Sequence, residues 1–365
     1  MKLNSTKIII RKLSLILCII ITLVSCQRKP LYDSCICQNT LVIPIAVDWT
    51  KSGIVLQNVS VLFYDYYTDE LLYQHTYEQN DKDIQSYVAL PSGKYKAVIF
   101  NEQPNEIDYV SCIDYDNFNT LKFESNGTSP MLSRSTSARG YVEQPGDLAV
   151  AVVEEIEITD EMIVEAAQVD DSSSATTKSL TAVTLATVES LMGVVPDKKT
   201  CTIEIVAHIK GLNNALMALA DLINLADGYY VGSDMNSTVP SSLQFVMNNR
   251  VYDDDTKQDG TISATLTAFG TLGDRESISG HDASTPIVLD ILFKLVDEDA
   301  TEYALETDVT NYLSFTEDGT GTITIDIYIA FEEPLPDVEP ADSDDGSIFG
   351  SSVEDWGETV IVPLS

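Results

Sequence analysis

Short segments of β-type sequence recur along most of this chain, and turn residues separate them. In the first half, residues 58–67 and 70–77 flank Thr68 and Asp69 and are typical of a β-hairpin. Further strands are predicted at residues 41–49, 87–90, 94–101, 107–114 and 148–158. Short strands at this spacing favour a β-sandwich over alternating strand and helix units. The sequence therefore predicts a first sandwich over residues 41–168.

The second half is predicted to form another sandwich, over residues 180–331, after a polar linker at 169–179. One helix is expected within it at residues 212–226, because the apolar residues recur at helical spacing and Gly228 follows as a cap. The strands are expected at residues 181–191, 202–210, 243–249, 261–269, 286–296 and 322–331. The predicted fold class is mainly β: two tandem sandwiches with one helix in the second.

The first 25 residues have the pattern of a lipoprotein signal peptide. Residues 1–12 carry four positive charges and no acid, and residues 13–24 are apolar but too short for a membrane span, which needs about 20 residues. Leu23, Val24 and Ser25 then precede Cys26 in the manner of a lipobox. We expect cleavage before Cys26, a lipid on its sulfur, and a tether over residues 26–40 that holds the protein at the outer membrane, on the cell surface.

The chain is strongly acidic, with 57 Asp and Glu against 21 Lys and Arg and a formal charge of −36. A surface this negative is repelled by phosphate backbones, which excludes nucleic acid as a partner. Four further cysteines are disulfide candidates, since an exported chain meets an oxidising compartment. They are Cys35, Cys37, Cys112 and Cys201, and free thiols are the alternative.

No catalytic motif is present, and we predict neither an enzyme nor a cofactor. Two acidic clusters, Asp253, Asp255 and Asp259 in one and Asp342 and Asp344 in the other, offer oxygens for Ca²⁺, although solvated loops explain them more simply. Five tyrosines near the first hairpin form either a sugar-stacking platform or ordinary packing. They are Tyr64, Tyr66, Tyr67, Tyr73 and Tyr77, and strand periodicity puts Tyr67 on the opposite face from Tyr64 and Tyr66.

Several short segments resemble a lipoprotein family of Bacteroidales that is grouped with the fimbrillin-like proteins. They are residues 47–49, 61–64, 90–95, 98–101, 225–229, 264–270 and 289–295. The resemblance implies two transthyretin-like sandwiches in a cell-surface lipoprotein related to fimbrial stalk, tip and anchor subunits. It implies no catalytic residues. A subunit that keeps its lipid resembles an anchor more than a stalk.

Residues 332–365 form an acidic tail rich in Pro, Gly and Ser that ends in a strand-like segment. Its apolar residues are candidates for donation to a neighbour's sheet, and the alternative is that they fold back onto their own sandwich. They are Thr359, Val360, Ile361, Val362 and Leu364. The predicted function is that of a fimbrial anchor or accessory subunit in adhesion, with fimbrial subunits as partners. The alternative is a surface lipoprotein that binds host glycans or proteins without polymerising.

Overall fold

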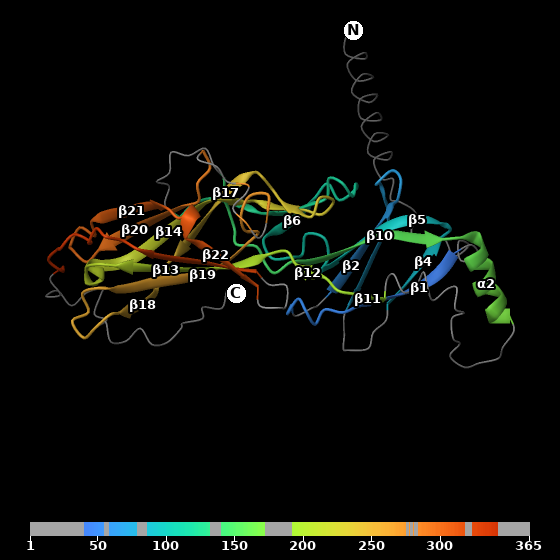
Figure 1. Cartoon of the computed structure of the whole chain (residues 1–365), viewed down its shortest axis with the longest axis horizontal. Coiled ribbons are helices and arrows are strands. Elements are labelled where there is room, and N and C mark those ends of the chain that lie inside the picture. Colours follow the sequence, from blue (N-terminus) through green and yellow to red (C-terminus); the bar gives the residue numbers. More distant parts are fainter. Residues whose placement is uncertain are drawn as a thin grey trace, which may run out of the picture.

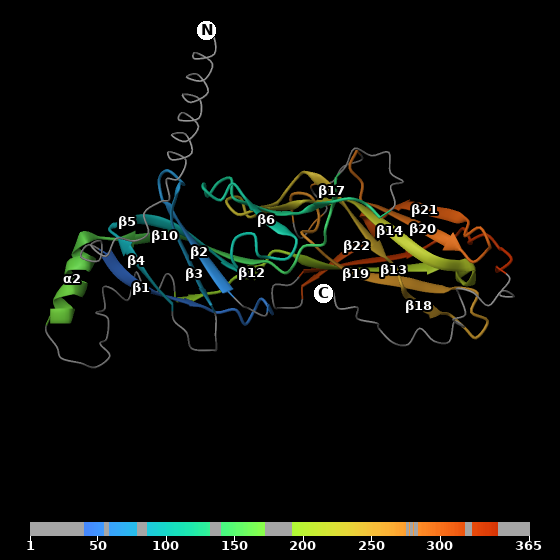
Figure 2. The same cartoon turned by 180° about the vertical axis from the view of Figure 1, so that it is seen from behind.

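Strands account for most of the protein that the computed structural model describes, which comprises residues 40–54, 58–78, 86–131, 140–171, 192–274, 277, 280, 284–317 and 323–341. The strands form five sheets, which lie along one long axis (Figures 1 and 2). The predicted mainly β fold class is confirmed. The predicted signal peptide, the tether before Thr40, the strand at 181–191 and the last residues of the tail lie outside the described residues.

The first half contains two facing sheets with strand orders β11-β1-β4 and β12-β10-β5-β2-β3. Ile43, Val61 and Ile99 belong to the core between them. The strands of these sheets are β1 (Thr40–Val47), β2 (Asn58–Asp65), β3 (Leu71–Glu78), β4 (Ser86–Pro91), β5 (Gly93–Asn101), β10 (Ala149–Ile158), β11 (Met192–Val194) and β12 (Asp197–Lys198). The β2–β3 hairpin is confirmed, although β2 ends at Asp65 rather than Tyr67.

A helix that the sequence analysis did not predict, α2 (Asp160–Asp171), ends the first half. Its first turn is capped by Thr159, whose hydroxyl accepts a hydrogen bond from the backbone N–H of Met162 (3.3 Å). Ile163 is buried against the first core. The predicted linker begins at Val169, which lies inside the last turn of α2, and residues 172–179 lie outside the described residues.

The second half is also a pair of sheets, with orders β18-β19-β13-β23-β22 and β21-β20-β14-β17-β9-β8. Along β13 buried residues alternate with more exposed ones, so Ile203, Ile205 and Ala207 face the core between the sheets. Two strands from the first half of the chain, β8 (Gly127–Thr128) and β9 (Tyr141–Val142), complete the second of these sheets. The other strands are β13 (Cys201–Ile209), β14 (Ala215–Ala226), β17 (Pro240–Val246), β18 (Asn249–Tyr252), β19 (Gly260–Ala268), β20 (Val288–Leu295), β21 (Glu302–Asp308), β22 (Leu313–Glu317) and β23 (Ile323–Ala330).

The predicted helix at residues 212–226 is wrong: only Leu212–Asn214 form a short 3-10 turn, and Ala215–Ala226 are strand β14. β14 lies between β20 and β17, and both of its faces are covered, so even Leu219 and Asp221 are buried. A strand buried on both faces reads as a nearly continuous apolar run, without alternation. Leu, Ala and Met are also strong helix formers, which made the run resemble a helix.

Gly228 is not a helix cap but part of a close strand pairing. It lies in β15 (Gly228–Tyr230), which pairs with β7 (Lys122–Ser125). A Cβ atom at position 228 would come within 2.2 Å of the carbonyl oxygen of Phe123. Only glycine allows the two backbones to approach this closely.

A fifth sheet, with order β16-β15-β7-β6, joins the two halves. Its strands β6 (Val110–Ile113) and β7 come from the first half, and β15 and β16 (Met235–Asn236) come from the second. The core beneath it combines residues of both halves, among them Phe100, Phe123 and Tyr229. β11 and β12 likewise follow the predicted linker but pair with β1 and β10. The two halves are therefore interlocked by strand pairing as well as by side-chain packing.

A buried lysine strengthens this junction. Only 7% of the Lys122 side chain is exposed, and its Nζ lies 2.9 Å from Oδ1 of Asp227 and 2.5 Å from Oε2 of Glu124. The ammonium group also lies 5.5 Å from the ring centroid of Tyr230. Burial pulls the pKa of Lys122 down, but the hydrogen bonds to Glu124 and Asp227 outweigh it, so the pKa is raised. A charged lysine on β7, from the first half, is thus paired with Asp227 of the second half.

Candidate functional site

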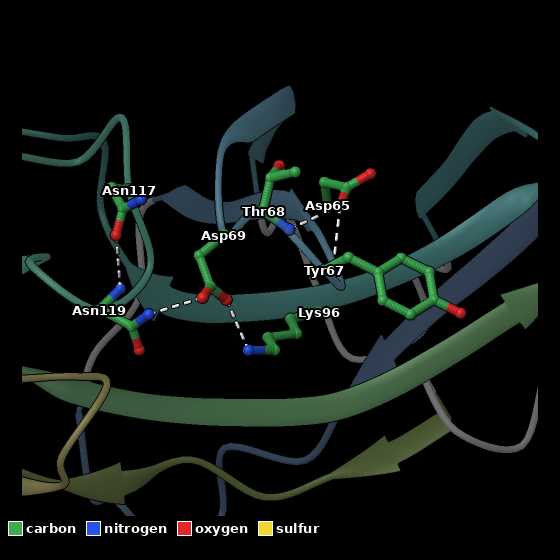
Figure 3. Close-up of polar contacts among 7 residues, drawn as sticks. All are labelled: Asp65, Tyr67, Thr68, Asp69, Lys96, Asn117 and Asn119. Atoms are coloured by element: carbon green, nitrogen blue, oxygen red, sulfur yellow. Dashed lines mark hydrogen bonds and ion pairs between the residues drawn. The ribbon is translucent and has the colours of Figure 1, made fainter.

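The turn between β2 and β3 carries the most exposed large apolar side chain in the described part of the chain, that of Tyr67 (74% exposed). Asp65 fixes the backbone of this turn, because its Oδ1 accepts hydrogen bonds from the N–H groups of Tyr67 (2.8 Å) and Thr68 (2.9 Å), as Figure 3 shows. The hydrogen bond from Thr68, which has the larger effect, and the one from Tyr67 hold the pKa of Asp65 below its usual value.

Asp69 ties the turn to the rest of the first half. It adopts a positive φ of 60°, and its carboxylate accepts hydrogen bonds from Nζ of Lys96 (2.5 Å) and Nδ2 of Asn119 (2.5 Å). Asn119 is in turn held by its backbone N–H, which donates to Oδ1 of Asn117 (3.0 Å) (Figure 3). Since Lys96 lies on β5 and Asn119 on a separate loop, the turn is braced from two directions.

Two lysines flank the ring of Tyr66, the other tyrosine of the turn. The Nζ atoms of Lys94 and Lys96 lie 5.8 and 5.7 Å from its centroid. The rings of Tyr66 and Tyr67 meet edge to face, with centroids 5.2 Å apart. Figure 3 shows the Tyr67 side chain pointing away from the Asp69–Lys96–Asn119 network, so the ring is presented to solvent.

Of the five tyrosines near the hairpin, only Tyr66 and Tyr67 lie on the turn. Tyr64 is fully buried and donates its hydroxyl hydrogen to the carbonyl oxygen of Tyr115 (3.0 Å), and burial raises its pKa. Tyr73 and Tyr77 pack against the first core, and burial raises the pKa of Tyr77 to about 12. The predicted alternation of faces fails beyond Tyr64, because β2 ends at Asp65 and the next residues form a turn.

The residues that brace this turn do not stand out in the sequence. Lys96 and Asn119 follow Asp69 by 27 and 50 positions in the chain. No local motif links residues that far apart. The signal that could be seen was the turn itself at Thr68 and Asp69.

The Asp253, Asp255 and Asp259 cluster lies at the turn between β18 and β19. Oδ2 of Asp253 lies 2.7 Å from Nε2 of His208, and Oδ1 of Asp259 accepts the backbone N–H of Gly211 (2.8 Å). Within the described ranges, no three His, Cys, Asp or Glu side chains gather in a group that could hold a metal ion. Asp342 and Asp344 lie outside those ranges.

Two of the four disulfide candidates lie in the described part, and they lie in different cores. Cys112 is a free thiol on β6 in the core beneath the fifth sheet, and burial raises its pKa to about 12. Cys201 is buried at the start of β13 in the core of the second half. The lipobox residues Leu23, Val24, Ser25 and Cys26, together with Cys35 and Cys37, lie outside the described residues, as do Thr359, Val360, Ile361, Val362 and Leu364.

No helix among the described residues has the length and apolar character needed to cross a membrane. No curated protein matches the sequence. Two solved structures illustrate what the chain is similar to. A candidate adhesin from Bacteroides ovatus shares 14% identity over 84% of this chain and 98% of its own, with a TM-score of 0.49. The fimbrial anchor protein Mfa2 from Porphyromonas gingivalis shares 11% identity over 80% of this chain and 90% of its own, with a TM-score of 0.44.

The match to a family model is of a different kind, because it rests on the sequence and covers residues 25–246, more than half of the chain. That model is described as a domain of unknown function, DUF5119, and the chain belongs to this family.

Proposed function

We propose that this protein is a non-catalytic, lipid-anchored cell-surface protein that serves as a fimbrial anchor or accessory subunit in adhesion. The lipobox ending at Cys26 and the resemblance to fimbrillin-like lipoproteins support an anchored surface protein. The single observation that carries the anchor role is that the two ends of the described chain lie at opposite poles of the long axis.

The N-terminal end of the described chain lies at the α2 pole. Thr40 pairs with Pro91, and the neighbouring Gly93 pairs with Ile158, two residues before α2 begins. Figures 1 and 2 show α2 at one extremity of the molecule. A tether over residues 26–39 therefore joins the body at this pole.

The C-terminal end lies at the other pole. The backbone N–H of Leu335 donates to the carbonyl oxygen of Lys210 (2.9 Å), and that of Ala341 donates to Val296 (2.9 Å), at the outer ends of β13 and β20. β10 and β13 start side by side, where Lys199 N–H donates to the carbonyl oxygen of Leu148 (2.7 Å), and run away from each other. At about 3.3 Å per residue, these ten- and nine-residue strands together span roughly 60 Å.

An anchor must connect a membrane attachment to an assembly partner, and this arrangement separates the two attachments by the length of the body. Labelling cells with a palmitate analogue tests the anchoring: the wild-type protein should take up the label and fractionate with outer membranes. Cys26→Ser should do neither. Label on Cys26→Ser, or none on the wild type, would overturn the anchored assignment.

The assembly role is tested by light scattering of the soluble mature chain carrying Cys26→Ser. Its matched control ends at Ala341, because an earlier cut at Phe331 would remove Leu335, which is 3% exposed and part of the second core. We expect the full chain to self-associate or to bind a fimbrial subunit, and the shortened chain to stay a folded monomer. Equal behaviour of the two forms would contradict a role for residues 342–365.

The second candidate function is a surface lipoprotein that binds glycans or proteins without polymerising. The braced and exposed Tyr67 is the observation that favours it. A mature chain that stays monomeric with every fimbrial subunit, and still binds a ligand, would select this function over the first.

A further inference from the structure

The outer face of the sheet β21-β20-β14-β17-β9-β8 carries two carboxylates side by side. Asp221 on β14 lies directly opposite Asp290 on the antiparallel neighbour β20. In such positions the Cβ atoms are about 4.5–5.5 Å apart, and like charges are destabilising. The residues that alternate with them, among them Ala220, Leu222 and Ile291, belong to the second core. Both aspartates therefore lie on the face that points away from that core.

Asp221 is buried, and the groups that hydrogen-bond it are neutral. Only 6% of the residue is exposed. Its carboxylate accepts hydrogen bonds from the hydroxyl of Tyr141 (2.8 Å) and from Nε2 of Gln244 (2.7 Å). Lys294 is the only basic residue on the strands of this sheet, and it lies four residues along β20 from Asp290, roughly 13 Å away. Because burying a carboxylate without a counter-charge is costly, the two aspartates require a cation from elsewhere.

Apolar residues beside the aspartates are buried on the same face. Leu219 and Leu292 lie two positions from Asp221 and Asp290 along β14 and β20, and they pair with each other. Both are buried, although neither belongs to the core between the sheets. An antiparallel sheet commonly leaves one face to water. The burial of these residues therefore indicates that something packs on this face.

Residues 132–139 are attached to this face at both ends. The backbone N–H of Met131 donates to Oε1 of Gln244, the residue of β17 that also binds Asp221. At the other end, the backbone N–H of Ser242 on β17 donates to the carbonyl oxygen of Gly140 (3.1 Å). The eight residues between these two attachments thus begin and end beside the aspartates.

Arg134 and Arg139 are the basic residues of this segment. The three residues from Met131 to Arg134 can extend about 10 Å, which equals the two strand spacings from β17 to β20. Arg139 directly precedes Gly140 beside β17, on the side away from β14, and so starts farther from Asp290. A guanidinium group has a planar set of donors that suits carboxylates.

We propose that residues 132–139 dock on the outer face of β14 and β20, where the guanidinium group of Arg134 binds the carboxylates of Asp221 and Asp290. Since the segment belongs to the first half and the aspartates to the second, this contact is a charge pair between the halves in addition to Lys122 and Asp227. The proposal goes beyond the fimbrial anchor role and stands whether or not the chain is lipidated or assembles.

The first test is limited proteolysis with trypsin, which must take the arginine side chain into its own pocket before it cleaves. The protein is the soluble mature chain with Cys26→Ser, and mass spectrometry measures the rate of cleavage after Arg134. Asp290→Asn should raise that rate at least tenfold. Glu302→Gln is the matched control, because Glu302 lies on the same face but opposite Lys294, and it should leave the rate unchanged. An unchanged rate in Asp290→Asn, or an equal rise in Glu302→Gln, would overturn the proposal.

A double-mutant cycle tests the pairing itself. Arg134→Met and Asp290→Asn should each lower the melting temperature by about 2–4 °C, and the double variant should lower it by clearly less than the sum. Additive shifts would overturn the proposal, as would coupling of Asp290→Asn to Arg139→Met instead. A melting temperature that falls with EDTA, or rises with protein concentration, would assign this face to a divalent cation or to a second copy of the chain and would also overturn it.

Discussion

The same local arrangement occurs in two regions, the junction between the halves and the β2–β3 turn, but its role differs between them. In each, a lysine lies between an aspartate and an aromatic ring: Lys122 with Asp227 and Tyr230 at the junction, Lys96 with Asp69 at the turn. Lys96 also lies 4.7 Å from the ring centroid of Phe118.

The difference lies in burial and in what each lysine joins. The Lys122 side chain is 7% exposed, against 16% for Lys96. Lys122 connects residues 105 positions apart, across the two halves, whereas Lys96 connects parts of the first half only. One arrangement therefore helps to hold the two halves together, and the other positions an exposed turn.

The largest effect is expected at the junction. Lys122→Ala leaves the buried carboxylate of Asp227 without its counter-charge, and breaking a buried pair in this way costs about 3–5 kcal/mol. Urea denaturation should show that loss of unfolding free energy. Lys210→Ala is the control, since Lys210 pairs with Glu332 at a largely exposed site, and it should cost less than about 0.5 kcal/mol. Similar losses of unfolding free energy for the two variants would show that the Lys122 pair stabilises the protein no more than an exposed pair does.

Lys96→Ala should have a smaller effect on stability and a clear effect on the turn. Loss of its charge-assisted hydrogen bond to Asp69 is expected to cost about 1–2 kcal/mol. Because the turn loses one of its two braces, the amide NMR signals of Tyr67 and Thr68 should broaden or shift. Denaturation and NMR spectra of the same variant measure both quantities. Amide signals equal to those of wild type would mean that Lys96 has no part in positioning Tyr67.

The β2–β3 turn should lose stabilising contacts in acid, and the junction should lose its own in alkali. The pKa of Asp65 is lowered in the folded protein. Its contribution to folding stability is therefore present above the usual carboxyl pKa and is lost as pH falls through the pKa of the folded state. The pKa of Lys122 is raised in the folded protein. Its contribution to folding stability is therefore present below the usual lysine pKa and is lost as pH rises through the pKa of the folded state.

Amide NMR signals of Tyr67 and Thr68 should therefore change first in acid. Melting temperatures should fall in alkali, and Lys122→Met should abolish the part of that fall due to the junction. An alkaline fall that is identical in Lys122→Met would contradict the assignment to Lys122.

The smallest effect is expected from Tyr67→Ala, which should change the unfolding free energy by less than about 0.5 kcal/mol because the ring is exposed. Tyr64→Ala, three residues earlier, removes a fully buried ring and should cost about 3–5 kcal/mol. Thermal unfolding compares the two variants. Near-equal losses would show that the Tyr67 ring carries structural contacts.

The sequence predicted strands rich in β-branched and aromatic residues well and the Leu- and Ala-rich strand poorly. β13 shows the alternation of a strand with one buried face, and β2 is buried along most of its length but is rich in Val, Phe and Tyr. β14 was taken for a helix because it is buried too and its Leu, Ala and Met residues are strong helix formers. α2 was missed, since its apolar face is short (Met162, Ile163 and Ala166) and lies in an acidic segment.

The site could be predicted only in part. Tyr66 and Tyr67 stand out in the sequence, but whether they lie on a strand or a turn depends on where β2 ends. The braces from Lys96 and Asn119, like the Lys122–Asp227 pair, join residues that only the tertiary fold brings together. Local patterns carry no information about such contacts.

We infer that the two halves form one interlocked body, with the two ends of the described chain at opposite poles. Single-molecule FRET tests it on a soluble mature chain with Cys26, Cys35 and Cys37 changed to Ser and dyes attached at Val164→Cys on α2 and Val251→Cys on β18. Both positions are exposed, at 54% and 59%, whereas Cys112 and Cys201 are buried. We predict a single, narrow and low transfer efficiency that does not change with time. Two interconverting efficiencies, or a broad distribution, would contradict the claim.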